Sequence, residues 1–181
     1  CPELCESRNQ IVNGGGPEDA DVLFVGEGPG AQEDSAGEPF VGRSGSVLDD
    51  ALQDCGLERE AIRITNCVRC RPPENRDPQK AELENCHEYL EREISRVNPT
   101  LVITLGKVPT EHLLGRDVAV TNESGDIEDV RRGDFTQQVL ICLHPAATLY
   151  DSSQAETFED TIATAAGFVG TDGNGNGQSR L

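Results

Sequence analysis

The first third of the sequence holds a glycine-rich segment in which carboxylates stand beside bare main chain. It reads Gly26-Glu27-Gly28-Pro29-Gly30 and is followed by Glu33 and Asp34. Residues without side chains let a ligand approach the backbone closely. The segment is a poor dinucleotide fingerprint, because position 31 lacks the third glycine, and it is no P-loop, because no Gly-Lys-Ser/Thr follows. It suits a ligand-binding turn, with an ordinary strand-to-helix turn as the alternative.

Two ring-bearing residues lie where loops are expected. Phe40, one of five phenylalanines, is flanked by Pro39 and by glycines. An aromatic ring held on a loop can stack on a flat ligand such as a nucleobase, although a ring folded back onto the core is the alternative. His144 directly follows an apolar run and precedes Pro145. That position suits a ligand site, and a hydrogen-bonded core histidine is the alternative.

Seven cysteines are present, and we interpret them as metal ligands plus core residues rather than disulfides. The candidate ligands are Cys1, Cys5, Cys67, Cys70 and Cys86. A four-thiolate site holds zinc or an iron–sulfur cluster, and the spacing does not choose between them.

Basic residues gather in one stretch of an otherwise acidic chain. Residues 61–80 hold five basic and two acidic side chains, and Arg69, Arg71 and Arg76 are among them. A basic island suits contacts with phosphate groups. Pairing of these arginines with nearby carboxylates is the alternative.

The overall charge narrows the classes of partner. The chain has 15 Lys+Arg against 33 Asp+Glu, a formal charge of −18, and its only lysines are Lys80 and Lys107. This acidity ordinarily argues against a nucleic-acid partner. A solvated acidic protein is one interpretation. Adaptation to molar salt is the other, because the Debye length there falls to about 3 Å and repulsion from DNA is screened. The scarcity of lysine favours salt adaptation.

The sequence shows no sign of a membrane or secreted protein. No apolar run reaches the roughly 18 residues of a membrane span. No basic segment followed by an apolar stretch marks a signal peptide. We therefore expect a cytoplasmic protein without a membrane partner.

Short apolar runs predict buried strands that alternate with helices. The expected strands are residues 21–26, 61–68, 101–105 and 139–143. The expected helices are residues 46–55, 79–97 and 157–168, with a short helix ending at Leu114. The alternation predicts a parallel sheet covered on both faces, with ligands beyond the carboxyl ends of its strands. Residues 27–45 are expected as a long loop, and the polar residues 117–136 suggest a hairpin.

Together these motifs resemble the family 4 uracil-DNA glycosylases, the iron–sulfur branch of the uracil glycosylase superfamily. The matching segments occur in family order: Gly26–Gly30 with Glu33 and Asp34, Pro39–Arg43, Thr65-Asn66, Arg69–Pro73 with Asn75 and Arg76, and His144–Ala147. The resemblance covers residues 1–168, expected as one domain. It implies a three-layer α/β/α sandwich on a central four-stranded parallel sheet, which agrees with the predicted alternation. The Gly/Asn-rich tail, residues 169–181, is expected to be disordered.

The resemblance assigns roles in base recognition and reaction. It implies that Phe40 stacks on a flipped uracil, that Asn66 binds the polar edge of the base, and that Glu33 fills the space of thymine's 5-methyl group. Glu27 and the backbone of Gly28 would lie at the side of the catalytic water.

His144 would point at the uracil O2 and stabilise the departing uracil anion. Contacts with DNA are expected from Arg43, Arg69, Arg71, Asn75 and Arg76. The implied reaction hydrolyses the N-glycosidic bond of deoxyuridine in single- or double-stranded DNA, leaves an abasic site and initiates base excision repair. We expect a monomer from a halophilic archaeon.

The resemblance also implies a [4Fe–4S] cluster. Cys70 and Cys86 match two family ligands, and Cys1 matches the second of two N-terminal cysteines. The first would lie upstream of Cys1, unless Cys5 replaces it with a C-x3-C spacing. We favour the upstream ligand, so the expected cluster is incomplete or absent in this chain.

Three other functions stay open. One is a sister glycosylase with a wider range of bases, and another is a non-catalytic nucleic-acid-binding iron–sulfur protein on the same scaffold. The third, a nucleotide-binding oxidoreductase with a cluster, lacks its cofactor fingerprint.

Overall fold

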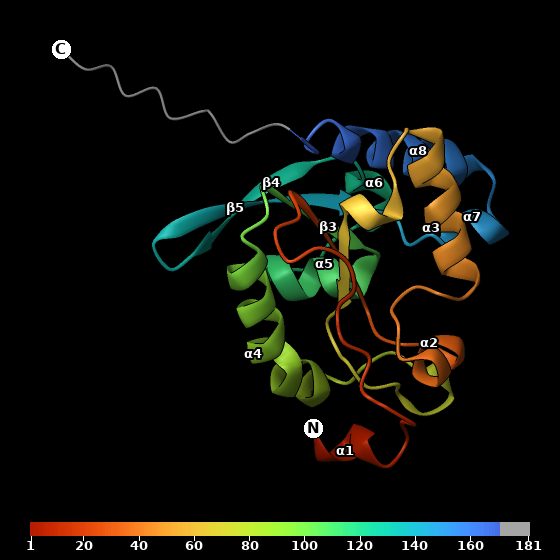
Figure 1. Ribbon diagram of the computed structural model, residues 1–181, viewed down its shortest axis with the longest axis vertical. Helices are drawn as coiled ribbons and strands as arrows, with labels where there is room; N and C mark the ends of the chain where they lie inside the picture. Colours follow the sequence, from red (N-terminus) through yellow and green to blue (C-terminus); the bar gives the residue numbers. More distant parts are fainter. Residues whose placement is uncertain (171–181) are drawn as a thin grey trace.

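The centre of the computed structural model, which describes residues 1–170, is a five-stranded sheet with the order β2-β1-β3-β5-β4 (Figure 1). The strands are β1 (Val22–Gly26), β2 (Arg63–Asn66), β3 (Leu101–Leu105), β4 (Ile127–Arg132) and β5 (Phe135–Cys142). Strands β2, β1, β3 and β5 pair in parallel, whereas β4 pairs with β5 in antiparallel orientation. The four expected strands therefore form a parallel sheet, as predicted.

The expectation of four strands in all is wrong, because β4 adds a fifth, antiparallel strand. Its side chains alternate between exposed and half-buried, and four of its six residues are charged. A strand at the edge of a sheet needs little apolar surface, so its hydrophobic signal is weak. The suggested hairpin is present: β4 and β5 are joined across Gly133, which has a positive φ of 60°.

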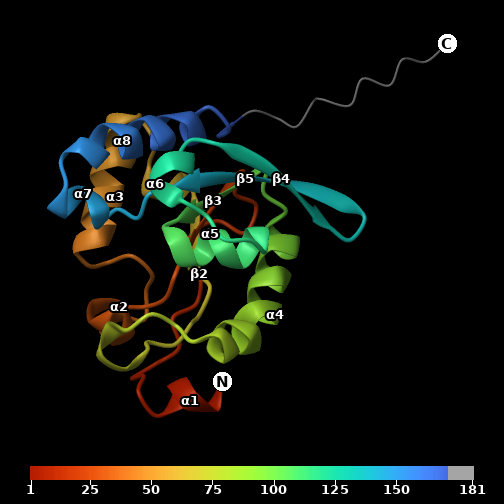
Figure 2. The same ribbon diagram turned by 180° about the vertical axis from the view of Figure 1, so that it is seen from behind.

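Helices cover both faces of the sheet (Figure 2). Helices α3 (Arg43–Asp54) and α8 (Ser153–Ala166) pack on one face, and α4 (Lys80–Val97) and α5 (Lys107–Leu114) pack on the other. Side chains of one strand alternate between the two layers, as in β1, where Phe24 joins the first core and Leu23 and Val25 join the second. The structure is thus an α/β fold whose sheet is buried on both sides.

Helix α4 forms where the sequence predicts it. Leu90, Ile94 and Val97 recur at helical spacing and are buried. At its start, the Glu82 carboxylate accepts a hydrogen bond from the backbone N–H of Gln79 at 2.8 Å. The helix ends at Asn98, which adopts a left-handed conformation before Pro99. The amphipathic pattern and these end signals are local, which explains why they could be found in the sequence.

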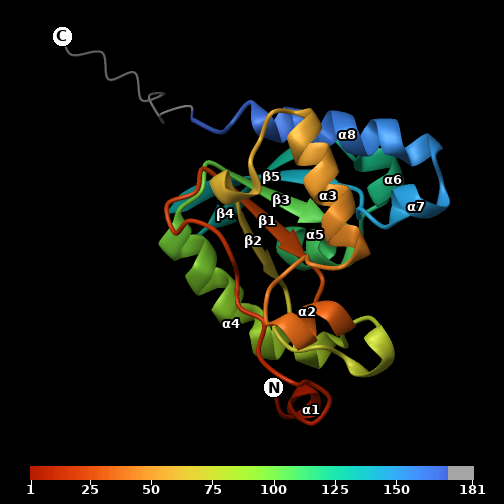
Figure 3. The same ribbon diagram turned by 45° about the vertical axis from the view of Figure 1, so that its right-hand side comes forward.

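The segment 27–45, expected as a loop, contains the short helix α2 (Ala31–Ala36). The Asp34 side chain is fully buried and accepts hydrogen bonds from the backbone and side-chain N–H groups of Asn9. This carboxylate anchors the N-terminal segment to α2. Figure 3 shows α1 (Pro2–Cys5), α2 and the loop before α4 together at one end of the molecule.

The remaining elements are short. They are the 3-10 turns η1 (Arg59–Ala61) and η2 (Pro73–Asn75) and the helices α6 (Val120–Glu123) and α7 (Ala147–Tyr150). None of the helices in the described part of the chain combines the length and apolar composition needed to cross a bilayer. From residue 171 onward, the predicted tail lies outside the described residues.

Candidate active site

A cavity of about 200 Å³ lies at the carboxyl ends of the parallel strands. Its walls are formed by Glu27, Gly28, Gly30, Glu33, Phe40, Ser44, Asn66, Asn75 and His144. All but Gly30 and Ser44 are predicted site residues, so the fold brings together side chains that lie as much as 117 positions apart in the sequence. Ser44 was not among the predicted site residues. It lies in the first turn of α3, and the available sequence signal was its position directly after the Pro39–Arg43 motif.

Asn66 ends strand β2 and presents an unpaired acceptor to this region. The residue is 3% exposed, and its Oδ1 is buried with no hydrogen-bond partner among the described residues. An unsatisfied buried acceptor costs about 1–3 kcal/mol, so it marks a place where a ligand donor is expected. The approach depends on Gly26, because a Cβ there would lie 2.4 Å from Asn66 Oδ1.

Phe40 forms an aromatic wall beside this acceptor. It is 7% exposed, and its φ of 54° lies in the left-handed region that side chains rarely adopt. The ring passes over Gly26, where a Cβ would lie 2.6 Å from it, and its centroid is 6.3 Å from that of His144. Backbone strain of this kind concentrates at functional sites and persists when neighbours enforce it.

The Glu33 carboxylate helps to hold the backbone at Phe40 in this strained conformation. Its Oε1 accepts hydrogen bonds from the backbone N–H groups of Val41 at 3.1 Å and Gly42 at 2.9 Å. Its Oε2 accepts one from the N–H of Gly30 at 3.1 Å. Three main-chain donors therefore hold this carboxylate in place, and the carboxylate in turn holds the chain that follows Phe40.

Glu27 is a titratable group poised near neutrality. Burial raises the pKa of its carboxyl group to about 7, and the negative charge of Asp77 adds to the shift. Both effects disfavour the ionised form. A carboxyl with this pKa is populated in both protonation states at neutral pH, which is the property that a general base or acid needs.

His144 is held in one tautomer. Its Nδ1 accepts a hydrogen bond from the backbone N–H of Ala146 at 3.1 Å, so the neutral ring carries its proton on Nε2. Burial lowers the pKa of the imidazole below its ordinary value, which keeps the ring neutral at pH 7. Gly106 allows this packing, because a Cβ there would lie 3.0 Å from that of His144. The arrangement offers the site a neutral N–H donor.

Asn75 reaches the cavity from a strained loop. Both Glu74 and Asn75 have positive φ values, of 57° and 56°. Arg71 Nε donates a hydrogen bond to Asn75 Oδ1 at 2.7 Å and so fixes the orientation of the amide. This contact leaves the amide N–H2 group as the donor that Asn75 can offer to a ligand.

The predicted DNA-contacting arginines have different surroundings. Arg76 makes a bidentate ion pair with the fully buried Glu82 carboxylate: its Nη1 donates to Oε2 at 2.9 Å and its Nη2 to Oε1 at 2.7 Å. Arg69 donates to Glu93 at 2.7 Å and lies over the Tyr89 ring. Neither lines the cavity. These two side chains follow the alternative of pairing with carboxylates.

Arg43 and Arg71 lack such a partner. Arg43 is exposed at the start of α3, and Arg71 is bound to the Asn75 amide. Within residues 1–170, neither forms an ion pair with a carboxylate.

Three of the predicted cluster ligands, Cys1, Cys70 and Cys86, lie in one small core between the N-terminal segment and α4. Cys70 and Cys86 are buried in one small core with Leu4, and Cys1 packs against it. Cys5 is exposed and donates its thiol hydrogen to the carbonyl of Cys1 at 3.1 Å. Thiols packed together are suitable donors for iron, so the residues present fit a cluster in part.

The fit has two limits. No group of three or more His, Cys, Asp or Glu side chains in the described residues is arranged to hold a metal ion. Moreover, the Arg8 guanidinium donates to Cys70 Sγ at 2.8 Å. Cys67, the fifth candidate, is buried in a different core, under α4, where burial raises the pKa of its thiol far above the ordinary value.

Comparison with known proteins extends these observations to most of the chain. Residues 13–166 match the family model described as the uracil DNA glycosylase superfamily. The type-4 uracil-DNA glycosylase of Archaeoglobus fulgidus is 37% identical over 161 residues, which is 87% of this chain and 81% of that protein. The type-4 enzyme of Thermotoga maritima is 38% identical over 84% of this chain and 78% of its own length, and that of Pyrobaculum aerophilum is 36% identical over 90% and 85%.

These comparisons do not show the halophilic origin that was expected from the charge.

They do show the family. The superfamily model matches most of the chain, the type-4 relatives align along nearly its whole described length, and the motif residues line one cavity. The chain therefore belongs to the type-4 uracil-DNA glycosylases of the uracil DNA glycosylase superfamily.

Proposed function

We propose that this chain hydrolyses the N-glycosidic bond of deoxyuridine in DNA, releases uracil and leaves an abasic site, and so initiates base excision repair. The single observation that carries the assignment of the site is the unpaired Oδ1 of Asn66, which is buried close to the Phe40 ring in the cavity that His144 also lines. A cavity of about 200 Å³ admits one base. The target nucleotide must therefore leave the base stack before it can enter.

Recognition of uracil follows from complementary hydrogen bonds. The N3–H of uracil donates to Asn66 Oδ1, and the Asn66 amide N–H2 group donates to O4, while the face of the base stacks on Phe40. Cytosine presents an acceptor and a donor in the opposite places, so it leaves the buried amide unpaired.

Exclusion of thymine rests on the fixed carboxylate of Glu33. The base of thymine differs from uracil by one methyl group at C5. Because Glu33 is bound by the three backbone N–H groups of Gly30, Val41 and Gly42, it cannot move aside without breaking them. The methyl group therefore meets a rigid wall.

Bond cleavage is driven by stabilisation of the departing base. The C1′–N1 bond breaks with its electron pair moving onto uracil, and the sugar becomes oxocarbenium-like. The neutral His144 donates its Nε2–H to the developing charge on O2, which is an interaction that strengthens in the transition state. A water molecule between the sugar and the Glu27 carboxylate adds to C1′ and gives its proton to that carboxylate. Uracil then leaves as the anion and is protonated by solvent.

Contacts with the DNA backbone fall to Arg43 and Arg71. Both lack a carboxylate partner in the described residues. Each adjoins a residue that lines the cavity: Arg43 precedes Ser44 in the sequence, and Arg71 is hydrogen-bonded to Asn75. Arg69 and Arg76 hold the loop between them in place through Glu93 and Glu82. This loop supplies Asn75 to the cavity.

A [4Fe–4S] cluster bound by Cys1, Cys70 and Cys86, with a further ligand, would tie the N-terminal segment to α4. Its role is structural, because these cysteines do not line the cavity. Cys5 is not included among these ligands, because its side chain is exposed and lies outside the small core that holds the other three cysteines.

The test is uracil release from a single-stranded oligonucleotide with one uracil, followed by alkaline cleavage of the abasic site, in about 2 M KCl, where repulsion is screened. A thymine oligonucleotide is the control substrate. Asn66→Ala is expected to slow release roughly ten- to a hundredfold through loss of the paired acceptor. Asn122→Ala removes an exposed asparagine of α6 and should match the unsubstituted chain. Release from thymine DNA, or an unaffected Asn66→Ala, contradicts the proposal.

A further inference from the structure

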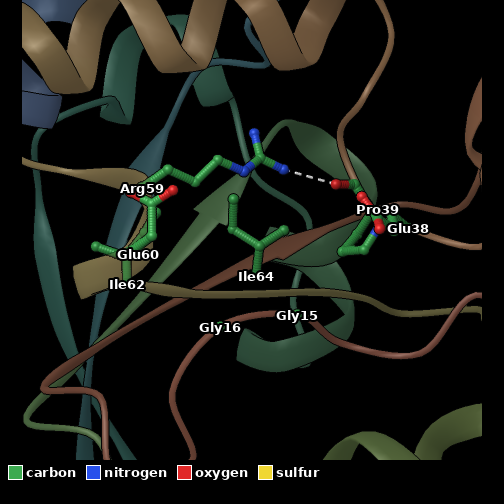
Figure 4. A pocket seen from close by; sticks show the side chains of 8 residues that line it. All are labelled: Gly15, Gly16, Glu38, Pro39, Arg59, Glu60, Ile62 and Ile64. Carbon is green, nitrogen blue, oxygen red and sulfur yellow. Dashed lines mark hydrogen bonds between the residues drawn. The ribbon is translucent and has the colours of Figure 1, made fainter.

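A second cavity lies behind the Phe40 loop, outside the site described above. It has a volume of about 460 Å³ and is lined by Gly15, Gly16, Glu38, Pro39, Arg59, Glu60, Ile62 and Ile64. Figure 4 shows Arg59 reaching across this cavity to the main chain at Pro39. The Arg59 Nη2 donates a hydrogen bond to the Pro39 carbonyl oxygen at 2.6 Å.

Arg59 is itself held by a second contact. It lies in the turn η1 that connects α3 to β2, and its Nη1 donates to Asp49 of α3 at 2.6 Å. The Asp49 side chain is 47% exposed and the Arg59 side chain 30%. This outer ion pair is solvated and contributes little by itself, so the bond to the Pro39 carbonyl does not depend on it.

The Pro39 carbonyl has a particular place in the backbone. It belongs to the peptide plane that precedes the Cα of Phe40, and the orientation of that plane sets φ of Phe40. The N–H of Val41 belongs to the plane that follows and is bound to Glu33. The two peptide planes on either side of Phe40 are thus anchored separately, one by Arg59 and the other by Glu33.

The anchors are needed because Phe40 adopts a conformation that it would otherwise leave. Its φ of 54° is disfavoured for a residue with a side chain. On one side the loop is tightly packed, since a Cβ on Gly45 would lie 1.9 Å from the Phe40 carbonyl oxygen. On the other side lies the open cavity. Among the residues that the structure describes, Arg59 alone donates a hydrogen bond to the Pro39 carbonyl.

We propose that Arg59 is a positioning residue of the base-stacking wall: by holding the Pro39 carbonyl it fixes the Phe40 ring in the uracil cavity without touching the base. The proposal rests on the proposed stacking role of Phe40. Without Arg59, the Pro39–Phe40 peptide turns into the second cavity and the ring loses its fixed orientation. Stacking on uracil weakens, whereas contacts with the DNA backbone do not change.

The test compares Arg59→Ala with Asp49→Ala. Both substitutions remove the exposed ion pair, and Arg59→Ala alone removes the bond to the Pro39 carbonyl. Three quantities are measured well below the melting temperature: the single-turnover rate of uracil release, the inhibition constant of free uracil, and the dissociation constant of abasic-site DNA. Abasic DNA has no base to stack, so it reports on backbone binding alone.

Arg59→Ala is expected to slow release and weaken inhibition by uracil by about tenfold to a hundredfold, as small misplacements in a site do. Its affinity for abasic DNA should stay unchanged, and Asp49→Ala should match the unsubstituted chain in all three quantities. In a Phe40→Ala background, Arg59→Ala should cause no further loss, because the ring that it positions is absent.

Two results overturn the proposal. In the first, Arg59→Ala and Asp49→Ala release uracil at the same rate although Phe40→Ala is slower. In the second, Arg59→Ala loses affinity for abasic DNA as strongly as it loses the rate of release. Full activity of Phe40→Ala would instead refute the stacking role on which the proposal depends, and absence of uracil release by the unsubstituted chain would refute the proposed function. If Arg59→Ala does not fold, Arg59→Met applies the same criteria, because methionine keeps an extended apolar side chain but has no donor for the Pro39 carbonyl.

Discussion

The raised pKa of Glu27 predicts how the rate of uracil release depends on pH. Burial and the charge of Asp77 raise the pKa of this carboxyl group to about 7. If the ionised form accepts the proton of the attacking water, about a tenth of the enzyme is competent at pH 6 and about nine-tenths at pH 8. The single-turnover rate should therefore rise about tenfold across this interval. His144 does not oppose the rise, because burial lowers the pKa of its imidazole.

Two substitutions separate Glu27 from other titrating groups. Asp77→Asn removes a negative charge that raises the pKa of Glu27, so the midpoint of the pH profile should move to lower pH. Glu27→Gln cannot ionise, so its residual rate should be flat between pH 6 and 8. Rates are measured with a uracil oligonucleotide under single-turnover conditions at constant ionic strength, because salt changes DNA binding.

Stability provides an independent check on the same group. A carboxyl whose pKa is higher in the folded state stabilises the fold at low pH, and this contribution is lost as pH rises from about 4.5 through about 7. Glu27→Gln should therefore melt at a higher temperature than the unsubstituted chain at pH 8, with the difference shrinking toward pH 5. A flat or falling rate in the unsubstituted chain, or an upward shift in Asp77→Asn, would refute the assignment of Glu27 as the base.

Four further predictions concern other parts of the molecule. His144→Ala should lower the rate of release about a hundred- to a thousandfold by removing the donor to O2, with KM little changed, and an unaltered rate would exclude that role. Glu33→Ala should lower the preference for uracil over thymine, measured with paired oligonucleotides; an unchanged ratio would show that the carboxylate does not exclude the methyl group. Iron that co-purifies with the chain should fall on Cys86→Ser and stay unchanged on Cys55→Ser, as judged by metal analysis and visible absorbance; equal iron in the two variants would exclude Cys86 as a ligand. Raising KCl from about 0.1 to 2 M should raise the melting temperature by screening the −18 charge, and a constant temperature would argue against salt adaptation.

Local patterns explain which elements could be predicted. The strands β1 and β3 are continuous apolar runs, and α4 repeats apolar residues at helical spacing. Both signals depend on residues close together in sequence. The edge strand β4 and the short helix α2 carry weak signals of their own, because one is mostly charged and the other lies among glycines. They form through pairing and packing with distant segments.

The motif residues of the cavity were predictable as a set, because their order and spacing match a known family. Their individual surroundings were not. The sequence shows Arg69 and Arg76 in a basic stretch, but only the fold brings them against Glu93 and Glu82 of α4. The same holds for Arg59, which carries no motif and acquires its place because η1 lies beside the Phe40 loop.

The sequence by itself determined the parallel α/β core and the chemical groups that reach the carboxyl ends of the strands, since hydrophobic periodicity and residue type are properties of the chain. Tertiary structure decided what those groups are able to do. The pKa of Glu27 depends on burial and on a charge 50 positions away, and the tautomer of His144 depends on one backbone N–H. The conformation of Phe40 depends on anchors at positions 33 and 59. Electrostatic energies and hydrogen bonds depend on distance in space, which the folded chain sets.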